Sequence, residues 1–491
     1  MRRFRTAISV IGLLALLQPV QVNSVLGTVY YVSNGGSDDN DGVSPETPWH
    51  TISRVNAQPL APGDVVRLKR GDCWREGITP RSGSEQGPVA YSAYGHGDKP
   101  LLLGSIEKNR REDWTDEGGN IWSTAAPSDV GNIIFDGEAS CGVKVWNSSE
   151  LNAQGRFWYD RSNRLLKLYS TTCPADRYTD IECALRPHMI EESGRSYIIY
   201  EQLALKYGGA HGIGGGETHH IVVRDCDFSY LGGGELPMDG RIVRFGNGVE
   251  FWGNAHDNLV ERCRLWEIYD AALTNQNRGA VVRQYNLRYR CNLIWNCEYS
   301  FEYWNRPEES LTDHVYFENN TCVNAGGGWG HTQRPDPSGR HLCFYTTPAV
   351  TRDIYVRNNI FYEAHGHAFY APRLTEKGLA SLRLDHNCWY QSEGNMVLLP
   401  QQSYPMARFA DYQAAIRLDA HSIVADPRLA DTAKRDFHLS RTSPCIDAGT
   451  VVGLQTDFAG VPIPQGKAPE IGAYEYEPSP ESHPQAGLGQ Q

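Results

Sequence analysis

The 491-residue chain lacks the features of several large protein classes. Its net charge is −12, which argues against nucleic acid or an anionic membrane as a partner. No CxxC or HxxxH spacing indicates a zinc site. No lysine lies between Lys206 and Lys377, so lysine is excluded from any chemistry located in that stretch.

Long apolar runs are also missing, except at the N-terminus. Arg2, Arg3 and Arg5 precede a short apolar run at 8–17, followed by small residues up to Gly27. This pattern is typical of a secretory signal peptide and is too short to span a bilayer. We therefore predict a signal peptide at 1–27, no membrane insertion, and a mature protein that is secreted to the periplasm or the medium.

What the chain does contain is a repeat. A β-rich run followed by Cys or Asn, a polar residue and an apolar residue occurs six times between 195 and 394. The positions taken as equivalent are Cys226, Cys263, Cys291, Asn319, Asn358 and His386, and three of the five intervals are 28 residues. Such a period indicates a solenoid, and alternating strand patterns exclude helical repeats. A propeller or a sandwich is the alternative, but propeller blades are longer. We predict an all-β, right-handed parallel β-helix.

Twelve cysteines lie in the mature chain. Because cysteine is often fully buried, we expect Cys226, Cys263 and Cys291 to stack as free thiols in neighbouring turns. Export also permits disulfides, for which Cys173 and Cys183 are the best candidates.

Both ends of the mature chain resemble a known family. The opening stretch contains YYVSNGGSDDNDGVSPETPWHTI and LAPGDVVRLKRGDCW, and the closing stretch contains DFHLSRTSPCIDAGT and PEIGAYEYE. These phrases are similar to those of secreted right-handed parallel β-helix proteins of the pectate-lyase-like superfamily. The resemblance implies the fold, export and action on polysaccharides, as lyase or glycoside hydrolase, although many members have no known activity.

The predicted organisation has six parts. After the signal peptide come an N-terminal cap with the first turns (28–105), a β-rich insertion (106–190), the β-helix core (191–399), a C-terminal capping module (400–477) and a disordered tail (478–491). Met406–Arg417 is the clearest helix candidate. The loop SDDNDG at 37–42 either binds calcium or is simply rich in turn residues. The sequence leaves open whether the insertion forms a wall of a cleft.

The two long intervals of the repeat predict where a cleft lies. Their extra residues lie at 231–248 and 326–341, at the same point after the repeat phrase. Two loops that leave the same corner of the solenoid, three turns apart, enclose a groove, and such loops often carry function.

The floor of this groove follows from three aligned phrases, GVEFW (248–252), ALTNQ (272–276) and SFEYW (300–304). If Val249, Leu273 and Phe301 point inward, strand alternation turns Glu250, Thr274 and Glu302 outward in one column. Trp252, Gln276 and Trp304 form the next outward column, and Asp270 aligns with Glu298. The alternatives are ordinary surface charges neutralised by Arg244, Arg278 or Arg306, and tryptophans packed beneath the loops.

The candidate site follows from this arrangement. We expect catalysis by Glu302, Glu250 and Asp270, and substrate binding by Trp252, Asn275, Glu298, Tyr303, Trp304, Trp329, His331, Arg334 and Asp336. No metal is expected, and His219, His220, His365 and His367 are interpreted as surface or packing residues.

Two carboxylates suit glycoside hydrolysis, our first hypothesis, with one protonated as acid and one ionised. The alternatives are a lyase that uses arginine as base on a uronate glycan, and a non-catalytic carbohydrate-binding protein. A polysaccharide or oligosaccharide is the expected partner, the protein is expected to be a monomer, and no cofactor other than calcium is foreseen.

Overall fold

The computed structural model describes residues 27–345, 350–400 and 402–477. The signal-peptide prediction (1–27, of which only residue 27 is described) and the tail prediction (478–491) lie outside this part. Among the described residues, no helix is both long and apolar enough to cross a membrane.

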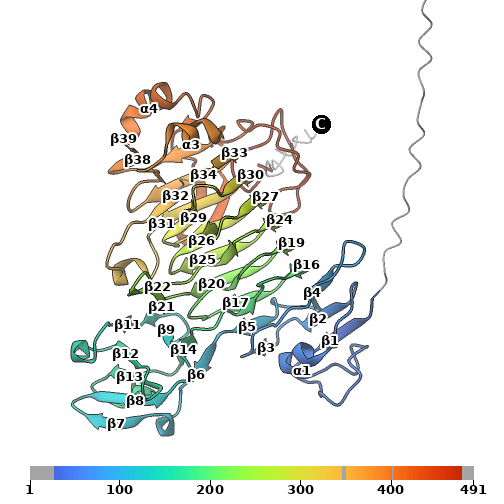
Figure 1. Ribbon diagram of the computed structural model, residues 1–491, viewed down its shortest axis with the longest axis vertical. Coiled ribbons are helices and arrows are strands. Elements are labelled where there is room, and N and C mark those ends of the chain that lie inside the picture. The colour runs from blue at the N-terminus through green and yellow to red at the C-terminus, as the bar shows by residue number, and fades with distance from the viewer. Residues whose placement is uncertain (1–26, 346–349, 401, 478–491) are drawn as a thin grey trace, which may run out of the picture.

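Three long sheets dominate the molecule, and from β16 to β38 the chain visits them in the order sheet 1, sheet 2, sheet 3 in each turn (Figure 1). Sheet 1 contains β1 (Val29–Val32), β2 (Val65–Lys69), β4 (Val89–Tyr94), β16 (Ser196–Glu201), β19 (His219–Arg224), β24 (His256–Glu261), β27 (Arg283–Arg290), β30 (Leu311–Glu318), β33 (Val350–Arg357) and β36 (Leu382–Asp385). Sheet 2 contains β3 (Cys73–Trp74), β5 (Leu101–Leu103), β17 (Ala204–Lys206), β20 (Asp227–Leu231), β25 (Arg264–Ile268), β28 (Leu293–Trp295), β31 (Thr321–Ala325), β34 (Ile360–Ala364), β37 (Cys388–Tyr390) and β40 (Ile423–Val424).

Sheet 3 contains β15 (Ile190–Glu191), β18 (Ile213–Gly216), β23 (Val249–Trp252), β26 (Ala271–Asn277), β29 (Tyr299–Asn305), β32 (Arg340–Phe344), β35 (Phe369–Tyr370), β38 (Asn395–Leu399) and β39 (Gln402–Pro405). Neighbouring strands of all three sheets pair in parallel, except that β39 runs antiparallel to β38. The fold is a right-handed parallel β-helix, and this prediction is confirmed.

The interior is filled by the inward residues of each strand. Val249, Leu273 and Phe301, which are in register on sheet 3, are completely buried in the main hydrophobic core. Each turn therefore buries its apolar face only against the turns before and after it, as a solenoid requires.

The predicted register of the repeat is wrong by one residue from the third turn onward. Strand pairing aligns Cys226 and Cys263 with Asn292, not with Cys291. Cys291 occupies the preceding position, with φ of 52°, and its thiol lies 4.0 Å from the carbonyl of Thr456 in the C-terminal module. All three cysteines are buried, but only the first two form the expected stack.

An asparagine ladder continues this column. Asn292, Asn320, Asn359 and Asn387 occupy it in successive turns. Each of the first three backbone N–H groups donates to the amide oxygen of the next asparagine, at 2.9–3.1 Å. The corner between sheets 1 and 2 turns sharply, and the buried amides satisfy the backbone groups that no strand can pair there.

The residues predicted as an insertion form two small sheets beside the N-terminal half of the solenoid (Figure 1). One contains β6 (Ser105–Glu107), β9 (Val130–Phe135), β10 (Ser140–Cys141) and β14 (Ile181–Leu185). The other contains β7 (Thr115–Gly118), β8 (Ile121–Ala125), β11 (Val143–Lys144), β12 (Arg156–Asp160) and β13 (Leu165–Tyr169). Cys173 and Cys183 are buried here as free thiols, so the expected bridge is absent.

The C-terminal module covers the outer face of sheet 2. Its antiparallel pair, β41 (Leu429–Asp431) and β42 (Asp436–Leu439), packs Phe437 against Trp295. The predicted helix at Met406–Arg417 is confirmed as the 3-10 turn η4 (Met406–Arg408) followed by α4 (Phe409–Ile416). The other helices are short: α1 (Ile52–Ala57), α2 (Pro174–Arg177), α3 (Glu376–Ser381), and the 3-10 turns η1 (Arg111–Asp113), η2 (Ser148–Glu150), η3 (His331–Gln333) and η5 (Thr432–Lys434).

The acidic loop at 37–42 is closed by its own hydrogen bonds. Asp38 accepts from the N–H groups of His50 and Thr51, both at 2.9 Å, and Asp41 accepts from the Thr47 hydroxyl at 2.7 Å. These bonds are typical of a turn-rich loop, and calcium binding there stays an untested alternative.

Candidate active site

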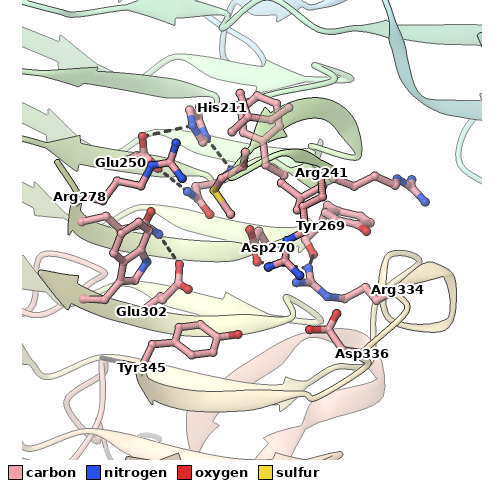
Figure 2. Close-up of a pocket in the computed structure, with 18 of the residues that line it drawn as sticks. His211, Arg241, Glu250, Tyr269, Asp270, Arg278, Glu302, Arg334, Asp336 and Tyr345 are labelled. Atoms are coloured by element: carbon pink, nitrogen blue, oxygen red, sulfur yellow. Dashed lines mark hydrogen bonds and ion pairs between the residues drawn. The ribbon is translucent and has the colours of Figure 1, made fainter. Parts of the chain in front are cut away.

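A cavity of about 750 Å³ opens on the outer face of sheet 3 (Figure 2). One wall is the hairpin of β21 (Gly234–Met238) and β22 (Arg241–Phe245), and the opposite wall includes Arg334–Asp336. These segments belong to the two long loops, so the prediction that both loops flank one groove is confirmed. The insertion adds Trp146 to the rim.

The register predicted for the floor is also confirmed. Glu250 on β23 pairs with Thr274 on β26, which pairs with Glu302 on β29. Trp252, Gln276 and Trp304 form the adjacent column in the same register. Both columns lie on the outer face because strand alternation sends every second side chain of a strand to the same face.

Glu250 is held as a carboxylate by two polar neighbours. The Asn247 side chain donates to one oxygen at 2.7 Å, and His211 Nε2 lies 3.2 Å from the other. His211 Nδ1 accepts the backbone N–H of Asn247 at 2.9 Å, which leaves Nε2 as the nitrogen that presents a proton to Glu250. Burial alone would raise the pKa of Glu250, but His211 and Asn247 outweigh burial and lower it.

A glycine makes this contact possible. Gly214 stands in register with Glu250 on the neighbouring strand β18. A Cβ atom at Gly214 would lie 2.8 Å from the His211 ring. The missing side chain therefore gives the imidazole the space in which it reaches Glu250.

Glu302 has the opposite environment. Its side chain is 4% exposed, and the Gln276 amide donates to one oxygen. Burial raises the pKa of Glu302 well above its usual value, the charges of Asp270 and Glu250 raise it further, and the Arg334 and Arg340 guanidiniums only partly oppose this. Burial and the neighbouring carboxylates therefore both favour the protonated form of this carboxyl group.

Asp270 lies between the floor and the second loop. Its carboxylate pairs with Arg334 at 3.2 Å. Burial raises the pKa of Asp270, and the charge of Arg334 opposes this without cancelling it. Arg334 also donates to the carbonyl oxygen of Tyr269 at 2.9 Å, which fixes the guanidinium at the floor.

Seven of the residues predicted for the site do line the cavity. They are Glu250, Trp252, Asp270, Glu302, Trp304, Arg334 and Asp336. The Trp252 and Trp304 rings meet edge to face at 5.5 Å, and Arg306 covers the Trp304 ring at 4.8 Å.

Two predicted binding residues point into the solenoid instead. Asn275 is fully buried and donates to Gln284 at 2.9 Å. Tyr303 is 1% exposed, with its hydroxyl group 2.9 Å from Thr351. Each follows an outward residue in its strand, so alternation turns it inward. Tyr303 is therefore not among the residues that line the cavity.

Three further predicted residues hold the second loop and are not among the residues that line the cavity. Glu298 accepts the backbone N–H groups of Ser338 and Gly339 at 2.6 and 3.0 Å, and His331 at 2.9 Å. The Trp329 indole donates to the carbonyl oxygen of Glu267 at 2.9 Å. Their role is to shape the loop.

Sequence reasoning missed several lining residues. His211, Asn247, Tyr269, Tyr345 and Tyr370 all face the cavity. Asn247 directly precedes the GVEFW phrase, so its position in the turn was available from the sequence. The position of His211 could not be read from the sequence, because it depends on the glycine-rich strand beside it.

The groove contains many arginines, although the protein as a whole is acidic. Lining arginines are Arg186, Arg241, Arg244, Arg278, Arg306, Arg334 and Arg373. Asp239, at the tip of the hairpin, pairs with both Arg278 (2.9 Å) and Arg306 (3.5 Å). Because one carboxylate pairs with two guanidiniums, positive charge remains in excess and the groove is locally cationic.

No protein-family model matches the chain. A curated relative, lacto-N-biosidase from Bifidobacterium longum subsp. longum, is 34% identical over 122 residues, which are 23% of this chain. The match spans only 7% of the length of that relative.

Among solved structures, pectate lyase Pel9A aligns over 93% of this chain and 98% of its own, with 14% identity and a TM-score of 0.48. XylC in complex with xylose covers 91% and 98%, with 11% identity and a TM-score of 0.44. A GH136 lacto-N-biosidase from Eubacterium ramulus covers 81% and 67%, with 14% identity and a TM-score of 0.34. The fold of this chain is established independently of these likenesses by its own strand pairing.

Proposed function

We propose that the protein is a glycoside hydrolase that cleaves a polysaccharide or oligosaccharide in the groove on sheet 3. The observation that carries the proposal is the pair Glu302 and Glu250, whose environments move their pKa values in opposite directions. Two carboxyl groups separated in this way are the acid and the base of glycoside hydrolysis. The short match to a lacto-N-biosidase supports the same class of reaction.

In this mechanism Glu302 donates its proton to the glycosidic oxygen as the bond to the anomeric carbon breaks. Glu250 takes a proton from a water molecule, whose oxygen forms the new bond to that carbon. One product gains a hydroxyl group at the leaving oxygen, the other at the anomeric carbon. Trp252 and Trp304 supply flat apolar faces for sugar rings.

The spacing of the pair favours inversion. Glu250 and Glu302 lie two strands apart, about 10 Å at the backbone. Thr274 stands between them in the same column. Inverting enzymes separate their carboxyl groups by roughly 6.5–9.5 Å. Asp270 with Glu302 is the closer, alternative pair.

A second candidate function is elimination by a polysaccharide lyase. The arginines of the groove favour it, because they suit a uronate carboxylate and one of them, such as Arg334 or Arg278, is the candidate base. A non-catalytic binding protein is the third alternative. Export and a monomeric state remain part of the proposal.

A glycan screen separates these functions. The panel contains neutral glycans, uronate glycans and a glycan that ends in lacto-N-biose, because of the local match. New reducing ends without ultraviolet-absorbing product support the hydrolase. An unsaturated uronate product supports the lyase, and binding without either signal supports the binding protein.

The ionisation of the two carboxyl groups should determine how activity depends on pH. Activity requires Glu250 ionised and Glu302 protonated, so it falls in acid as Glu250 gains a proton and in alkali as Glu302 loses one. His211→Gln removes a group that lowers the pKa of Glu250, so we expect the acidic limb of kcat/KM to move to higher pH. An unchanged acidic limb in this variant would contradict the assignment of Glu250 as base.

Trp304 is expected to contribute substrate binding. Trp304→Ala should raise KM roughly 2- to 10-fold, the range of an aromatic stacking contact, with a smaller effect on kcat. Trp304→Phe, which keeps a ring, is the matched control and should recover most of the affinity. Steady-state kinetics of the three proteins test this, and equal KM values in all of them would remove Trp304 from the binding surface.

A further inference from the structure

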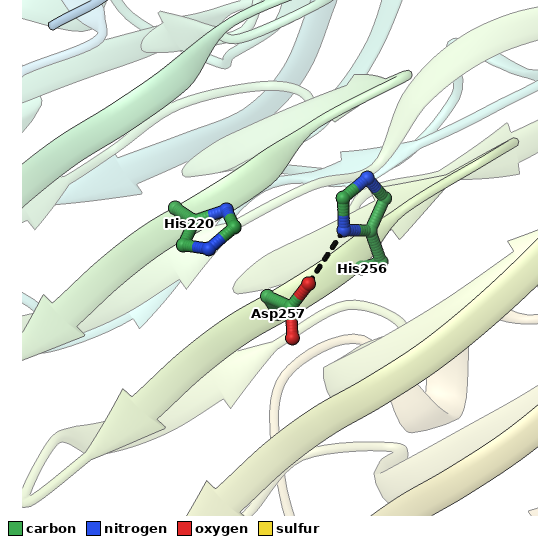
Figure 3. Close-up of side chains that lie close together, drawn as sticks. All are labelled: His220, His256 and Asp257. Carbon is green, nitrogen blue, oxygen red and sulfur yellow. Dashed lines mark hydrogen bonds and ion pairs between the residues drawn. The ribbon is translucent and has the colours of Figure 1, made fainter. Parts of the chain in front are cut away.

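A cluster of histidines lies at the corner where the chain passes from sheet 3 to sheet 1 (Figure 3). His219 on β19 is in register with His256 on β24, so His220 stands beside Asp257. His220 and Asp257 both have left-handed backbones, with φ of 56° and 54°. The same bend therefore recurs in two successive turns and presents both side chains at one point of the surface.

The donor atoms of the cluster converge. His220, His256 and Asp257 each offer one ligand atom, and these atoms all lie within 4.8 Å of one another. His219 Nδ1 lies 3.0 Å from His220 Nδ1, and the His219 and His256 rings are stacked at 4.8 Å. In a tetrahedral zinc site with bonds of about 2.0–2.1 Å, neighbouring ligand nitrogens are about 3.3 Å apart. The 3.0 Å between the Nδ1 atoms of His219 and His220 is close to this value, and the ligand atoms of His220, His256 and Asp257 lie within 4.8 Å of one another.

The carboxylate of the cluster is held in place from the next turn. Asn286 on β27 donates to one oxygen of Asp257, and His256 Nδ1 lies 2.7 Å from the other. A carboxylate that is fixed by a neighbouring amide is the kind of support that metal ligands have in proteins.

We propose that His220, His256 and Asp257, with His219 beside them, bind a divalent transition metal of the Zn²⁺ class. Imidazole nitrogens suit zinc and its neighbours, whereas calcium and magnesium take oxygen ligands. This differs from the sequence-based expectation of surface or packing histidines, because the HxxxH search considers only ligands on one segment. Here the ligands come from two turns.

The position of the cluster gives the metal a structural role. Residues 220 and 256 close a single turn of the solenoid, which contains β20, the hairpin β21–β22 and β23. That turn carries Glu250 and one wall of the groove. A metal bound at both ends of the turn would hold it closed and thereby stabilise the hairpin. This proposal does not depend on the reaction assigned to the groove.

The test is titration of the tag-free protein with Zn²⁺ by calorimetry and with Co²⁺ by visible absorption. We expect one equivalent to bind, with a d–d spectrum of tetrahedral Co²⁺, and a rise in the melting temperature with Zn²⁺. His220→Gln and His256→Gln should each weaken binding at least about tenfold and abolish the thermal shift.

His314→Gln is the matched control, since His314 occupies the same left-handed column two turns after Asp257 and lies outside the cluster. It should bind Zn²⁺ like the wild type. Circular dichroism of the metal-free variants checks that they fold. Absence of binding to the wild type at 100 µM Zn²⁺ overturns the proposal, and so does equal affinity in all variants. The latter result would move the metal to another group, such as Asp385, His386 and His421.

Discussion

Replacing Glu302 by glutamine is expected to lower kcat by roughly 10²–10⁴-fold, the usual contribution of a positioned acid or base. Glutamine keeps the shape and can still accept the bond from Gln276, but it has no acidic proton to transfer to the leaving oxygen. Glu250→Gln should cause a loss of similar size, since it removes the group that accepts the proton of water. Both variants are to be measured on the glycan identified by the screen, with folding checked by circular dichroism.

Glu201→Gln is the control for these variants. Glu201 is half-buried on sheet 1 and pairs with Arg224 at 2.9 Å, away from the groove. Its activity should equal that of the wild type. Full activity in both groove variants would eliminate the pair, and a persistent ultraviolet-absorbing product would assign the reaction to an arginine-based lyase. In the hydrolase, NMR of the fresh product should show an inverted anomeric centre.

The floor of the site could be predicted from the sequence because its phrases are nearly identical. GVEFW and SFEYW repeat the same alternation two turns apart, and alternation with the parallel register determines which side chains share a column. The two long loops could also be placed, because both interrupt the repeat at the same point. In a solenoid each turn contacts only its neighbours, so the pattern within one repeat also determines which residues meet in space.

The errors have equally definite causes. Asn275 and Tyr303 have side chains that suit sugar binding, but each follows an outward residue, so strand alternation turns it inward. The register error at Cys291 arose because cysteine and asparagine both occur at the corner, where the left-handed position and the buried position are adjacent.

The walls of the groove were harder to predict than its floor. The Asp-Gly pair at 239–240, with φ of 53° and 76°, closes the hairpin β21–β22 and is a strong local hairpin signal. That the hairpin tip pairs with Arg278 and Arg306 depends on contacts across turns, which no local pattern contains.

The asparagine ladder is expected to be the largest single contribution to stability outside the apolar core. Asn320 accepts the backbone N–H of Asn292 at 3.0 Å and donates to the carbonyl oxygen of Tyr289 at 3.0 Å, all in the buried interior. Asn320→Ala removes both of these buried hydrogen bonds, and each lost partner of a buried polar group costs about 1–3 kcal/mol.

We therefore expect Asn320→Ala to lower the free energy of unfolding by roughly 2–6 kcal/mol, measured by urea denaturation at constant pH. Asn395→Ala is the control, because Asn395 is exposed on β38, and a surface change of this kind is usually within about 0.5 kcal/mol. A ladder variant as stable as this control would mean that water replaces the lost amide. If the loss is as large as predicted, the corner between sheets 1 and 2 is held by hydrogen bonds, and the apolar stack alone does not set the stability of the solenoid.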